Sequence, residues 1–331
     1  MPSFHGPPPP SLPTVPLLST SYTRLSLGCS GHSTIYPGPS SPSSIPLAIK
    51  LGVNSLDTSP WYGASESVLG EALAGVPRAA YYLHTKAGRY PTADGQGCVF
   101  DFSKERTRSS VLESLRRLRV EYVDVCFVHD PEFCKGGVDG LKGCVDELLA
   151  LKAEGKVRHV GVTGYPLGLQ RDVILAYPGA FDVSMTYCHC GLFDDSLGPF
   201  KEFCKGKGVE VMSASPYGMG LLSGDGPPAW HPAGGDLRER CERVRDECRR
   251  RGCDVEGVAL GYAMKRGEEG GHVTVVGMRN EREVEFGVER CKAGGLIGDE
   301  EKEVAEACRR GGDDGWDGME EVRKFWEAEQ P

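Results

Sequence analysis

The sequence predicts an α/β protein built as a (β/α)8 TIM barrel, with a proline-rich N-terminal tail and a short C-terminal extension. Two observations favour this fold. Eight short apolar runs, each typical of a strand, alternate with helix-like stretches through most of the 331 residues. Three consecutive runs end on an ionisable residue, at Asp57, Lys86 and His129. Because barrel enzymes keep their chemistry at the carboxyl ends of the strands, this pattern also predicts where the active site lies.

The N-terminal segment is dominated by proline. Eleven of the 23 prolines precede residue 47, and residues 7–10 are consecutive prolines. Proline fixes φ and lacks a backbone N–H, which argues against a regular helix or a central strand up to about Leu18. We therefore expect residues 1–20 to form a disordered tail and residues 21–331 to form a single barrel domain. The tail is interpreted either as a docking peptide or as a dispensable segment.

The barrel elements follow from short hydrophobic runs and the residues that flank them. Val111, Leu115 and Leu118 lie on one stripe, which predicts a helix that begins at Ser103 and packs on the barrel. Ser65 is expected to cap an earlier helix. Polar, glycine-rich segments at 86–103, 224–236 and 267–271 are expected to be loops. The expected strands cover residues 24–31, 55–57, 81–86, 123–129, 157–163, 181–187, 209–214 and 272–276, and further helices cover 45–51 and 141–151.

Composition and charge argue against several classes of partner. The chain has 38 lysines and arginines against 47 aspartates and glutamates, a net charge of −9, and no dense basic run. This balance argues against nucleic acid or an anionic membrane as a partner. No apolar stretch approaches the ~20 residues of a membrane span. The 13 cysteines include no C-x-x-C pair, which favours reduced thiols and a cytoplasmic location.

One short cluster, Cys188-His189-Cys190, has residue types that bind metals. No second pair of ligands follows at zinc spacing. The alternation of the cluster also suits a strand. We therefore expect no metal site.

Four residues at or near three strand ends match a catalytic set. Asp57, Tyr62, Lys86 and His129 occur in the order typical of the aldo-keto reductase superfamily, which the sequence resembles. A free tyrosine has a pKa of ~10, and a nearby lysine cation favours its phenolate. Tyr62 is thus expected as the general acid or base, Lys86 as the group that lowers its pKa, and Asp57 as the anchor of Lys86. His129 is expected to orient the reacting oxygen.

Each of these residues also has an ordinary structural explanation. Tyr62 can be a rim aromatic, Lys86 a solvated strand end, and Asp57 a cap for the following turn. His129 and Asp130 can form a surface pair in which Asp130 is the orienting group. Two further functions stay open: an aldolase that uses Lys86 as a Schiff-base nucleophile, and a cofactor-binding regulatory subunit without turnover.

The cofactor site is expected to lack a Rossmann domain, because no G-x-G-x-x-G follows a strand. Residues 215–222 resemble the superfamily's loop after the seventh strand, whose backbone amides hold the pyrophosphate. The superfamily holds the nicotinamide carboxamide with Ser-Asn after strand five and Gln in strand six. Thr163-Gly164 and Thr186 occupy those places here, and Ala214 occupies the place of the tyrosine that stacks on the nicotinamide.

The expected cofactor is NAD, with NADP left open. Superfamily members that bind the 2′-phosphate of NADP present a lysine just after strand eight and an arginine about two turns later. Met278 and Val284 stand in those places and cannot pair with a phosphate, although Arg279 and Arg282 lie close by. The expected cofactor contacts are Thr163, Gly164, Thr186, Ser215, Tyr217, Gly220, Leu222, Gly277, Met278 and Arg279.

Three segments, 161–167, 184–189 and 213–216, resemble the L-galactose dehydrogenase and D-arabinose 1-dehydrogenase branch of the superfamily. The resemblance covers residues 24–288. It implies oxidation of a free aldose at its anomeric carbon to a lactone with NAD. Trp61, beside Tyr62, is expected either to stack on the sugar or to be a structural rim residue. The alternative enzyme is a general NADPH-dependent aldehyde or ketone reductase.

The C-terminal extension is expected to contain a flexible link at 311–318 and a short amphipathic helix at 319–329. In the superfamily a C-terminal loop often closes over the substrate. The resemblance implies that role for Trp316 or Trp326. A surface helix with one buried tryptophan is the other interpretation.

Overall fold

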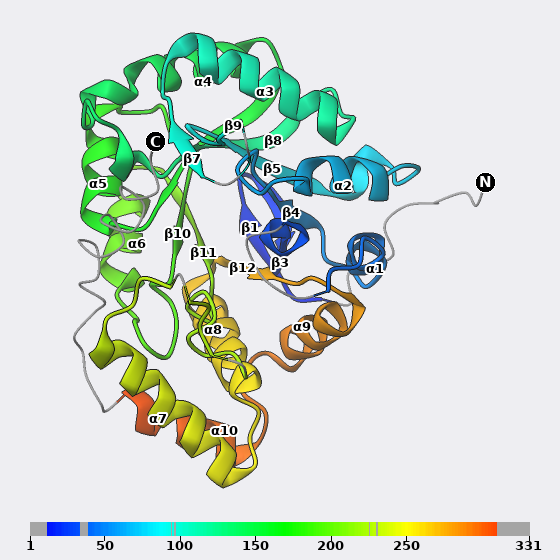
Figure 1. Cartoon of the computed structure of the whole chain (residues 1–331), viewed down its shortest axis with the longest axis vertical. Helices are drawn as coiled ribbons and strands as arrows, with labels where there is room; N and C mark the ends of the chain where they lie inside the picture. The colour runs from blue at the N-terminus through cyan, green and yellow to red at the C-terminus, as the bar shows by residue number, and fades with distance from the viewer. Residues whose placement is uncertain are drawn as a thin grey trace.

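The computed structural model describes residues 12–33, 39–93, 95, 97–224, 226–229 and 231–309. Eight parallel strands close into a barrel in the order β3-β4-β5-β8-β9-β10-β11-β12, with β12 pairing back onto β3 (Figure 1). The (β/α)8 fold and all eight expected strands are confirmed. The barrel strands are β3 (Leu25–Gly28), β4 (Ser55–Asp57), β5 (Tyr82–Ala87), β8 (Val123–His129), β9 (Val157–Gly164), β10 (Val183–Tyr187), β11 (Glu210–Ala214) and β12 (Val273–Gly277).

Helices surround this barrel. The helix α3 (Lys104–Leu118) begins as predicted, because the Ser103 side chain accepts a hydrogen bond from the Arg106 amide. Its buried face carries Val111, Leu115 and Leu118. The other helices are α1 (Ser44–Lys50), α2 (Ser65–Ala72), α4 (Lys142–Ala153), α5 (Leu167–Ala176), α6 (Leu197–Lys205), α7 (Gly235–Arg251), α8 (Val255–Gly270), α9 (Glu281–Ala293) and α10 (Gly298–Arg309).

The expected cap at Ser65 is wrong. Ser65 is the first residue of α2, and the capping position is Ala64, which makes no side-chain cap bond. The Ser65 hydroxyl instead donates to the Cys29 carbonyl at 2.9 Å and lies 2.9 Å from the Thr58 hydroxyl. The Ser65 hydroxyl therefore bonds a segment distant in the sequence instead of capping its own helix.

Two of the expected loops also contain regular structure. Residues 267–270 form the last turn of α8, and Gly271 ends that helix with φ +62°. The segment after β5 forms an antiparallel hairpin, β6 (Arg89–Pro91) with β7 (Cys98–Phe100). Glycine and polar composition hid both elements, because neither shows hydrophobic periodicity.

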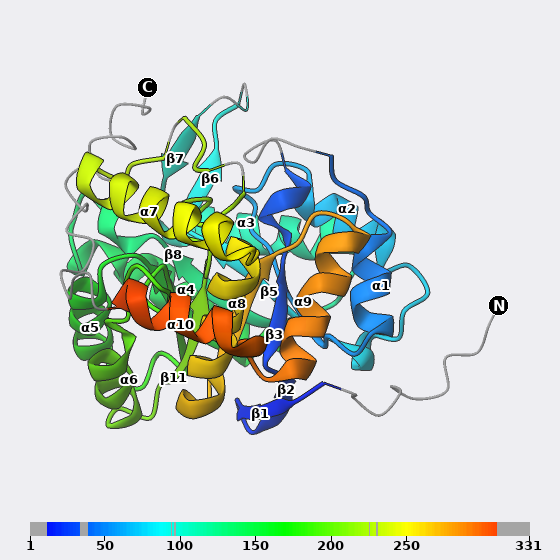
Figure 2. The same cartoon turned by 90° about the horizontal axis from the view of Figure 1, so that it is seen from below.

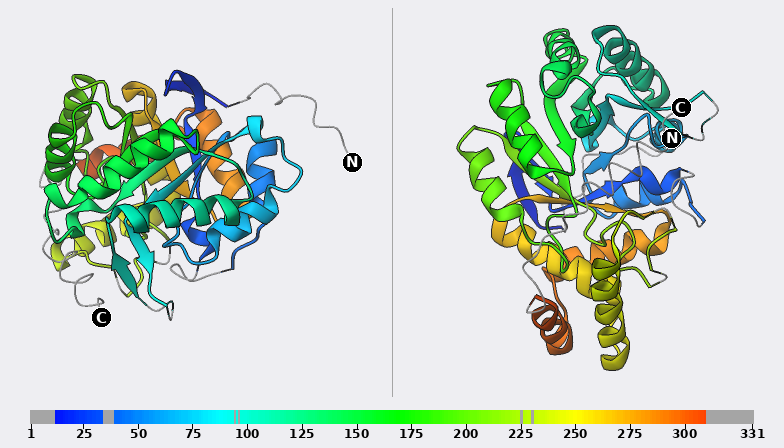
Figure 3. Two further views of the ribbon diagram at one scale, coloured as in Figure 1. Left: turned by 90° about the horizontal axis from the view of Figure 1, so that it is seen from above. Right: turned by 60° about the vertical axis from the view of Figure 1, so that its left-hand side comes forward.

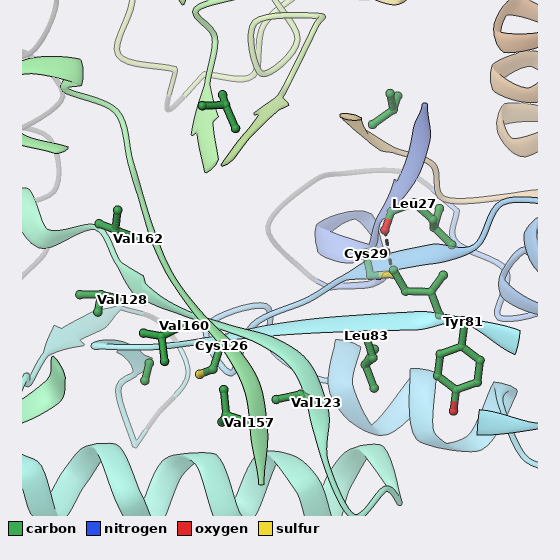
Figure 4. Close-up of a cluster of buried hydrophobic side chains, with 14 of the residues drawn as sticks. Leu27, Cys29, Tyr81, Leu83, Val123, Cys126, Val128, Val157, Val160 and Val162 are labelled. Atoms are coloured by element: carbon green, nitrogen blue, oxygen red, sulfur yellow. Dashed lines mark hydrogen bonds between the residues drawn. The ribbon is translucent and has the colours of Figure 1, made fainter. Parts of the chain in front are cut away.

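The strands carry two apolar faces. Figure 4 shows Cys126, Val128, Val160 and Val162 in the layer between β8, β9 and the helices. Phe127, which alternates with Cys126 and Val128, belongs to the separate cluster that fills the barrel. Burial of each such side chain contributes about 1.5–3 kcal/mol. Side chains thus fill the interior of the barrel, so the space for a site lies at the ends of the strands.

The N-terminal tail differs from expectation. Strand β1 (Thr14–Leu17) pairs antiparallel with β2 (Thr20–Thr23). Val15 and Leu17 are buried in the cluster that contains Phe127, so this hairpin lies across the amino-terminal end of the barrel. Disorder is therefore wrong for residues 12–20, and residues 1–11 lie outside the described residues. Pro16 is tolerated because a two-stranded hairpin has only edge strands.

The two hairpins lie at opposite ends of the barrel, β1–β2 at one end and β6–β7 at the other (Figure 2). Helices α7 and α10 pack together outside the barrel (Figure 3), where Leu237 and Val304 share one buried cluster. The expected link at 311–318 and helix at 319–329, with Trp316 and Trp326, lie outside the described residues. Within the described part of the chain, no helix combines the length and apolar character that a membrane span needs.

Candidate active site

A buried ion pair anchors the site at the ends of β4 and β5. The Lys86 ammonium lies 2.6 Å from Asp57 Oδ2 and donates to the Thr58 carbonyl at 2.9 Å. Both side chains are at least 95% buried. Burial lowers the pKa of Lys86, but Asp57 and Tyr62 raise it by more, so the net pKa is above its ordinary value. The ammonium therefore stays charged, which argues against a Schiff-base nucleophile.

Tyr62 follows a turn closed by its amide, which donates to the Ser59 carbonyl at 3.0 Å. The Lys86 ammonium lies 4.7 Å from the centre of the Tyr62 ring. Burial raises the pKa of Tyr62, and the attraction of Lys86 lowers it by less, so the net pKa is above its ordinary value. The expected net lowering of this pKa is therefore wrong, although the direction of the Lys86 effect is right.

His129 faces the same space from the end of β8. Its ring meets the Tyr62 ring edge-on, with 6.1 Å between centroids, and its Nδ1 lies 3.2 Å from the Ser59 hydroxyl. Burial, and then the charges of Lys86 and Arg89, hold the pKa of His129 well below its ordinary value. The imidazole is thus neutral at neutral pH and can exchange a hydrogen bond with a substrate oxygen. The structure brings together the four residues expected from the sequence.

A second ion pair borders this cluster and was missed from the sequence. The Arg89 guanidinium donates to Asp130 at 2.8 Å, and Asp130 Oδ2 lies 3.7 Å from His129 Nε2. The same guanidinium lies 4.4 Å above the Trp61 ring. Trp61 is half-buried, and Arg89 covers one of its faces. Arg89 follows Gly88 in a segment expected to be an irregular loop, so no pattern pointed to it.

Glu132 is the other residue that the sequence did not reveal. It lies in a 3₁₀ turn (η3, Pro131–Phe133) directly after β8, and its Oε1 accepts from the Tyr165 amide at 2.9 Å. Burial, and then the charge of Asp130, raise the pKa of Glu132 to about 8. Its place in the short His129-Asp130-Pro131-Glu132 run was the only available signal.

The expected carboxamide-binding residues lie at neighbouring strand ends. Thr163 and Gly164 end β9, Gly164 pairs in register with Thr186 on β10, and His129 pairs with Thr163. The Thr186 hydroxyl is buried and has no hydrogen-bond partner among the described residues. Ala214 ends β11 and pairs with Tyr187. The register thus places these residues beside the catalytic cluster.

The loop after β11 is a chain of tight turns. Ser215, Met219 and Gly220 all have positive φ, at +59°, +52° and +105°. The amides of Gly220 and Leu222 donate to the Tyr217 carbonyl at 3.3 and 3.0 Å. In this conformation these two amides close the turn. Leu222 is also fully buried.

The expected cofactor contacts in the segment after β12 differ in how far their side chains are exposed. The side chain of Met278 is 1% exposed and packs in the core, so it can contact a cofactor only through its backbone. Val284 is also fully buried, while Gly277 is exposed. Arg279 is held by Glu283, with Nη2 2.8 Å from Oε1 and its amide 2.7 Å from Oε2.

The Cys188-His189-Cys190 cluster is accounted for by ordinary contacts. His189 lies 3.1 Å from Asp194 through Nδ1 and 2.7 Å from the Tyr165 carbonyl through Nε2. Both cysteines are buried and reduced. Over the described ranges, no group of three or more acidic, histidine or cysteine residues could hold a metal ion.

Comparison with known proteins agrees with the fold. The model of the aldo/keto reductase family matches residues 37–307. The chain belongs to the aldo/keto reductase family. The chain is 41% identical over 247 residues to L-galactose dehydrogenase of Arabidopsis thaliana, covering 73% of this chain and 74% of the relative. It is 31% identical over 246 residues to D-arabinose 1-dehydrogenase of Saccharomyces cerevisiae, covering 67% and 70%.

Solved structures confirm the fold of the chain. The holo form of an aldo-keto reductase from Bacillus halodurans superposes with a TM-score of 0.72 at 21% identity, covering 92% of this chain and 98% of that one. The glycerol dehydrogenase of Gluconobacter oxydans gives a TM-score of 0.70 at 24% identity, covering 92% and 97%. As a family member with dehydrogenases among its relatives, the protein is an NAD(P)-dependent oxidoreductase.

Proposed function

We propose that this protein oxidises a free aldose, of the D-arabinose or L-galactose type, at its anomeric carbon to the lactone, using NAD. The similarity to two sugar dehydrogenases, one of them 41% identical, carries the choice of substrate class. The four-residue cluster of Asp57, Tyr62, Lys86 and His129 supports the reaction type. Trp61 offers an aromatic surface beside Tyr62 for the apolar face of a sugar ring.

The proton moves through Tyr62. As a phenolate, Tyr62 accepts the proton of the anomeric hydroxyl, and the fixed Lys86 ammonium stabilises the negative charge of the phenolate. Neutral His129 orients the reacting oxygen by a hydrogen bond. A bound nicotinamide cofactor supplies the hydride acceptor. The residues fit such a cofactor, because the strand register sets the hydrogen-bonding side chain of Thr163 beside His129 at the same end of the barrel.

The preference for NAD over NADP rests on Arg279 and Glu283. Arg279 is the first basic residue after β12, and its guanidinium is already paired with the Glu283 carboxylate. That carboxylate would also repel a 2′-phosphate. Neither Met278 nor Val284, which are buried, can replace the missing charge.

The test is a panel of free aldoses with NAD and with NADP, followed by nicotinamide absorbance. We expect NAD reduction with D-arabinose or L-galactose and little or none with simple primary alcohols. Brisk reduction of aromatic aldehydes with NADPH, together with no activity on any free aldose, would replace this proposal with a general aldehyde reductase.

We also propose a cytoplasmic location. Twelve of the 13 cysteines have described side chains; these 12 are all free thiols, and ten of them are buried. Thiols persist in reducing compartments, whereas secreted domains convert them to disulfides. Fractionation of cells that express the tagged chain tests this location.

A further inference from the structure

His84 is a histidine buried inside the barrel, on the strand that carries Lys86. It lies on β5 two residues before Lys86, and its side chain is fully buried. Its neighbours face the helices, because Leu83 belongs to the apolar layer beneath them and Thr85 donates to Glu66 of α2. Successive side chains of a strand point to opposite faces of the sheet. His84 therefore points into the barrel, on the same side as Lys86.

One ring nitrogen of His84 is held by the hairpin that covers the amino-terminal end of the barrel. Its Nε2 lies 3.3 Å from the Tyr22 hydroxyl, and the two rings stack with 5.8 Å between centroids. Burial, and then the charges of Lys86 and Arg78, lower the pKa of His84 to about 3, so the ring is neutral at neutral pH. A neutral ring carries one hydrogen, so it can accept from Tyr22 at Nε2 and donate from Nδ1.

Three polar atoms on this side of the barrel lack hydrogen-bond partners. The Nδ1 of His84, the Oδ1 of Asp57 and the Oγ of Ser55 are buried, and none has a partner among the described residues. Asp57 pairs in register with His84 on the neighbouring strand, and Ser55 lies two residues before Asp57. Leu56, between them, belongs to the apolar layer beneath the helices, so Ser55 and Asp57 both point into the barrel.

The space between these atoms suits a water molecule. Asp57 and Ser55 are about 6.6 Å apart along the strand, at a rise of about 3.3 Å per residue, which is too far for a direct hydrogen bond. A buried water makes two to four hydrogen bonds to polar groups that otherwise have no partner. A cation suits the place less well, because the Lys86 ammonium already neutralises Asp57. Phe127, which meets the His84 ring edge-on at 6.1 Å between centroids, belongs to the apolar cluster that fills the rest of the interior.

We propose that a water molecule is bound inside the barrel by Asp57 Oδ1, His84 Nδ1 and Ser55 Oγ. The water donates to Asp57 and accepts from the N–H of His84. Through this water His84 is a positioning residue for the ion pair of Asp57 and Lys86. Lys86 fixes Oδ2 of the carboxylate, and the water fixes Oδ1. This inference rests on the proposed function, because the ion pair acts on the proton that Tyr62 transfers.

The bound water bears on the proton-transfer step. Burial raises the pKa of Asp57 by more than Lys86 lowers it. A hydrogen bond donated to a carboxylate favours its charged form, so the water opposes the effect of burial. A charged Asp57 keeps Lys86 as an ammonium, and that ammonium stabilises the Tyr62 phenolate. Loss of the Nδ1 donor should therefore lower kcat and leave the binding of NAD unchanged.

The experiment separates the two ring nitrogens of His84. In His84→Asn the amide takes the place of Nδ1 and falls short of Tyr22. In His84→Gln the amide reaches the place of Nε2 and leaves no donor at the place of Nδ1. Both variants lose the ring and its contact with Phe127, so both lose similar packing. The control is His272→Gln, a buried histidine just before β12 whose Nδ1 also lacks a partner among the described residues.

Steady-state kinetics of aldose oxidation give the first measurement. We expect kcat of His84→Gln to fall about two- to tenfold, as loss of one hydrogen bond predicts, with an unchanged KM for NAD. His84→Asn should recover most of this loss, and His272→Gln should stay within about twofold of the unchanged chain. An equal loss of kcat in the two His84 variants would show that His84 only fills space.

NMR and crystallography test the water independently of turnover. In the unchanged chain labelled on histidine, we expect the ring hydrogen of His84 on Nδ1, with the signal assigned by its loss in His84→Gln. The crystal structure of the unchanged chain should show a water within hydrogen-bond distance of all three atoms. A hydrogen on Nε2, or no water between these atoms, would overturn the proposal. If the unchanged chain oxidises no free aldose, the proposed function fails, and these two measurements still decide the water site.

Discussion

At Tyr62, two physical effects oppose each other, and only one of them is visible in the sequence. The order of Asp57, Tyr62 and Lys86 predicted the ion pair and the neighbouring phenol, and the structure confirms that they lie together. Burial of the phenol is a tertiary property, and it outweighs the attraction of Lys86. Arg89 and Glu132 were not predicted for the same reason, because their roles arise from what the fold places beside them.

Tyr62→Phe should abolish turnover while cofactor binding is retained. The substitution removes only the proton-transferring hydroxyl, and loss of such a group typically lowers the rate about 10²- to 10⁴-fold. Steady-state kinetics with the aldose, alongside a fluorescence titration of the cofactor, test this. A variant with near-normal turnover would remove Tyr62 from the mechanism.

The rate of aldose oxidation should rise with pH across the alkaline range. The active form in this direction is the Tyr62 phenolate, and because the pKa of Tyr62 lies above its ordinary value, the phenolate fraction grows up to and beyond ~pH 10. The reverse reduction uses the protonated tyrosine and should lose rate over the same interval. Profiles of kcat/KM against pH for oxidation and for reduction test whether the two rates change in these opposite directions. An oxidation profile that levels off below neutral pH would contradict it.

Glu283→Gln should raise the efficiency with NADP relative to NAD. The substitution removes the carboxylate that holds Arg279 and frees the guanidinium for a 2′-phosphate. We expect the NADP/NAD ratio of kcat/KM to rise about tenfold, which corresponds to ~1.4 kcal/mol. Glu285→Gln, an exposed position on the same helix, is the control and should leave the ratio unchanged. An equal ratio in both variants would show that Arg279 does not set the preference.

At the scale of elements, the eight barrel strands were predictable because each is an apolar run bounded by turn residues. The hairpin β1–β2 was not, although buried Val15 and Leu17 do alternate with exposed Thr14 and Pro16. Four residues are too few for a reliable pattern, and the surrounding prolines outweighed them. The end of α8 was missed because its glycines are typical of loops. In both segments tertiary packing decides the structure, against the local preference of the prolines and the glycines.

Leu17→Ala should destabilise the protein by about 2–5 kcal/mol, because it leaves a cavity where the hairpin covers the barrel. Thr14→Ala, at an exposed position of the same strand, should change the free energy of unfolding by less than about 0.5 kcal/mol. Urea unfolding of both variants gives the comparison. Equal stability of the two would mean that the hairpin does not seal the barrel.

At the scale of the whole molecule, the two ends of the barrel have different roles. The β1–β2 hairpin covers the amino-terminal end, while the catalytic residues and the β6–β7 hairpin lie at the other end. The location of the chemistry could be predicted from the strand order, since every expected catalytic residue lies at or follows a strand's carboxyl end. The cofactor contacts could be predicted less well, because several depend on backbone conformation. Met278 is an example, since its side chain turns into the core.

Cofactor binding should stabilise the whole barrel. A ligand that binds only the folded state at 100 times its dissociation constant adds about 2.7 kcal/mol. We expect NAD to raise the melting temperature more than NADP at equal concentration, and Glu283→Gln to narrow the difference. Thermal unfolding without and with each cofactor measures these shifts in melting temperature. A larger shift with NADP in the unchanged chain would contradict the NAD preference.

The shared space of Glu132 and Gly164 also constrains how this protein can evolve. A single mutation that places asparagine at position 164 would collide with the carboxyl at position 132, since even a Cβ there lies 2.5 Å from Oε2. A single mutation that shortens Glu132 would vacate the space that its carboxyl occupies beside Gly164. The two positions, 32 residues apart in the chain, therefore form an epistatic pair. Lineages that differ at one of them are expected to differ at the other.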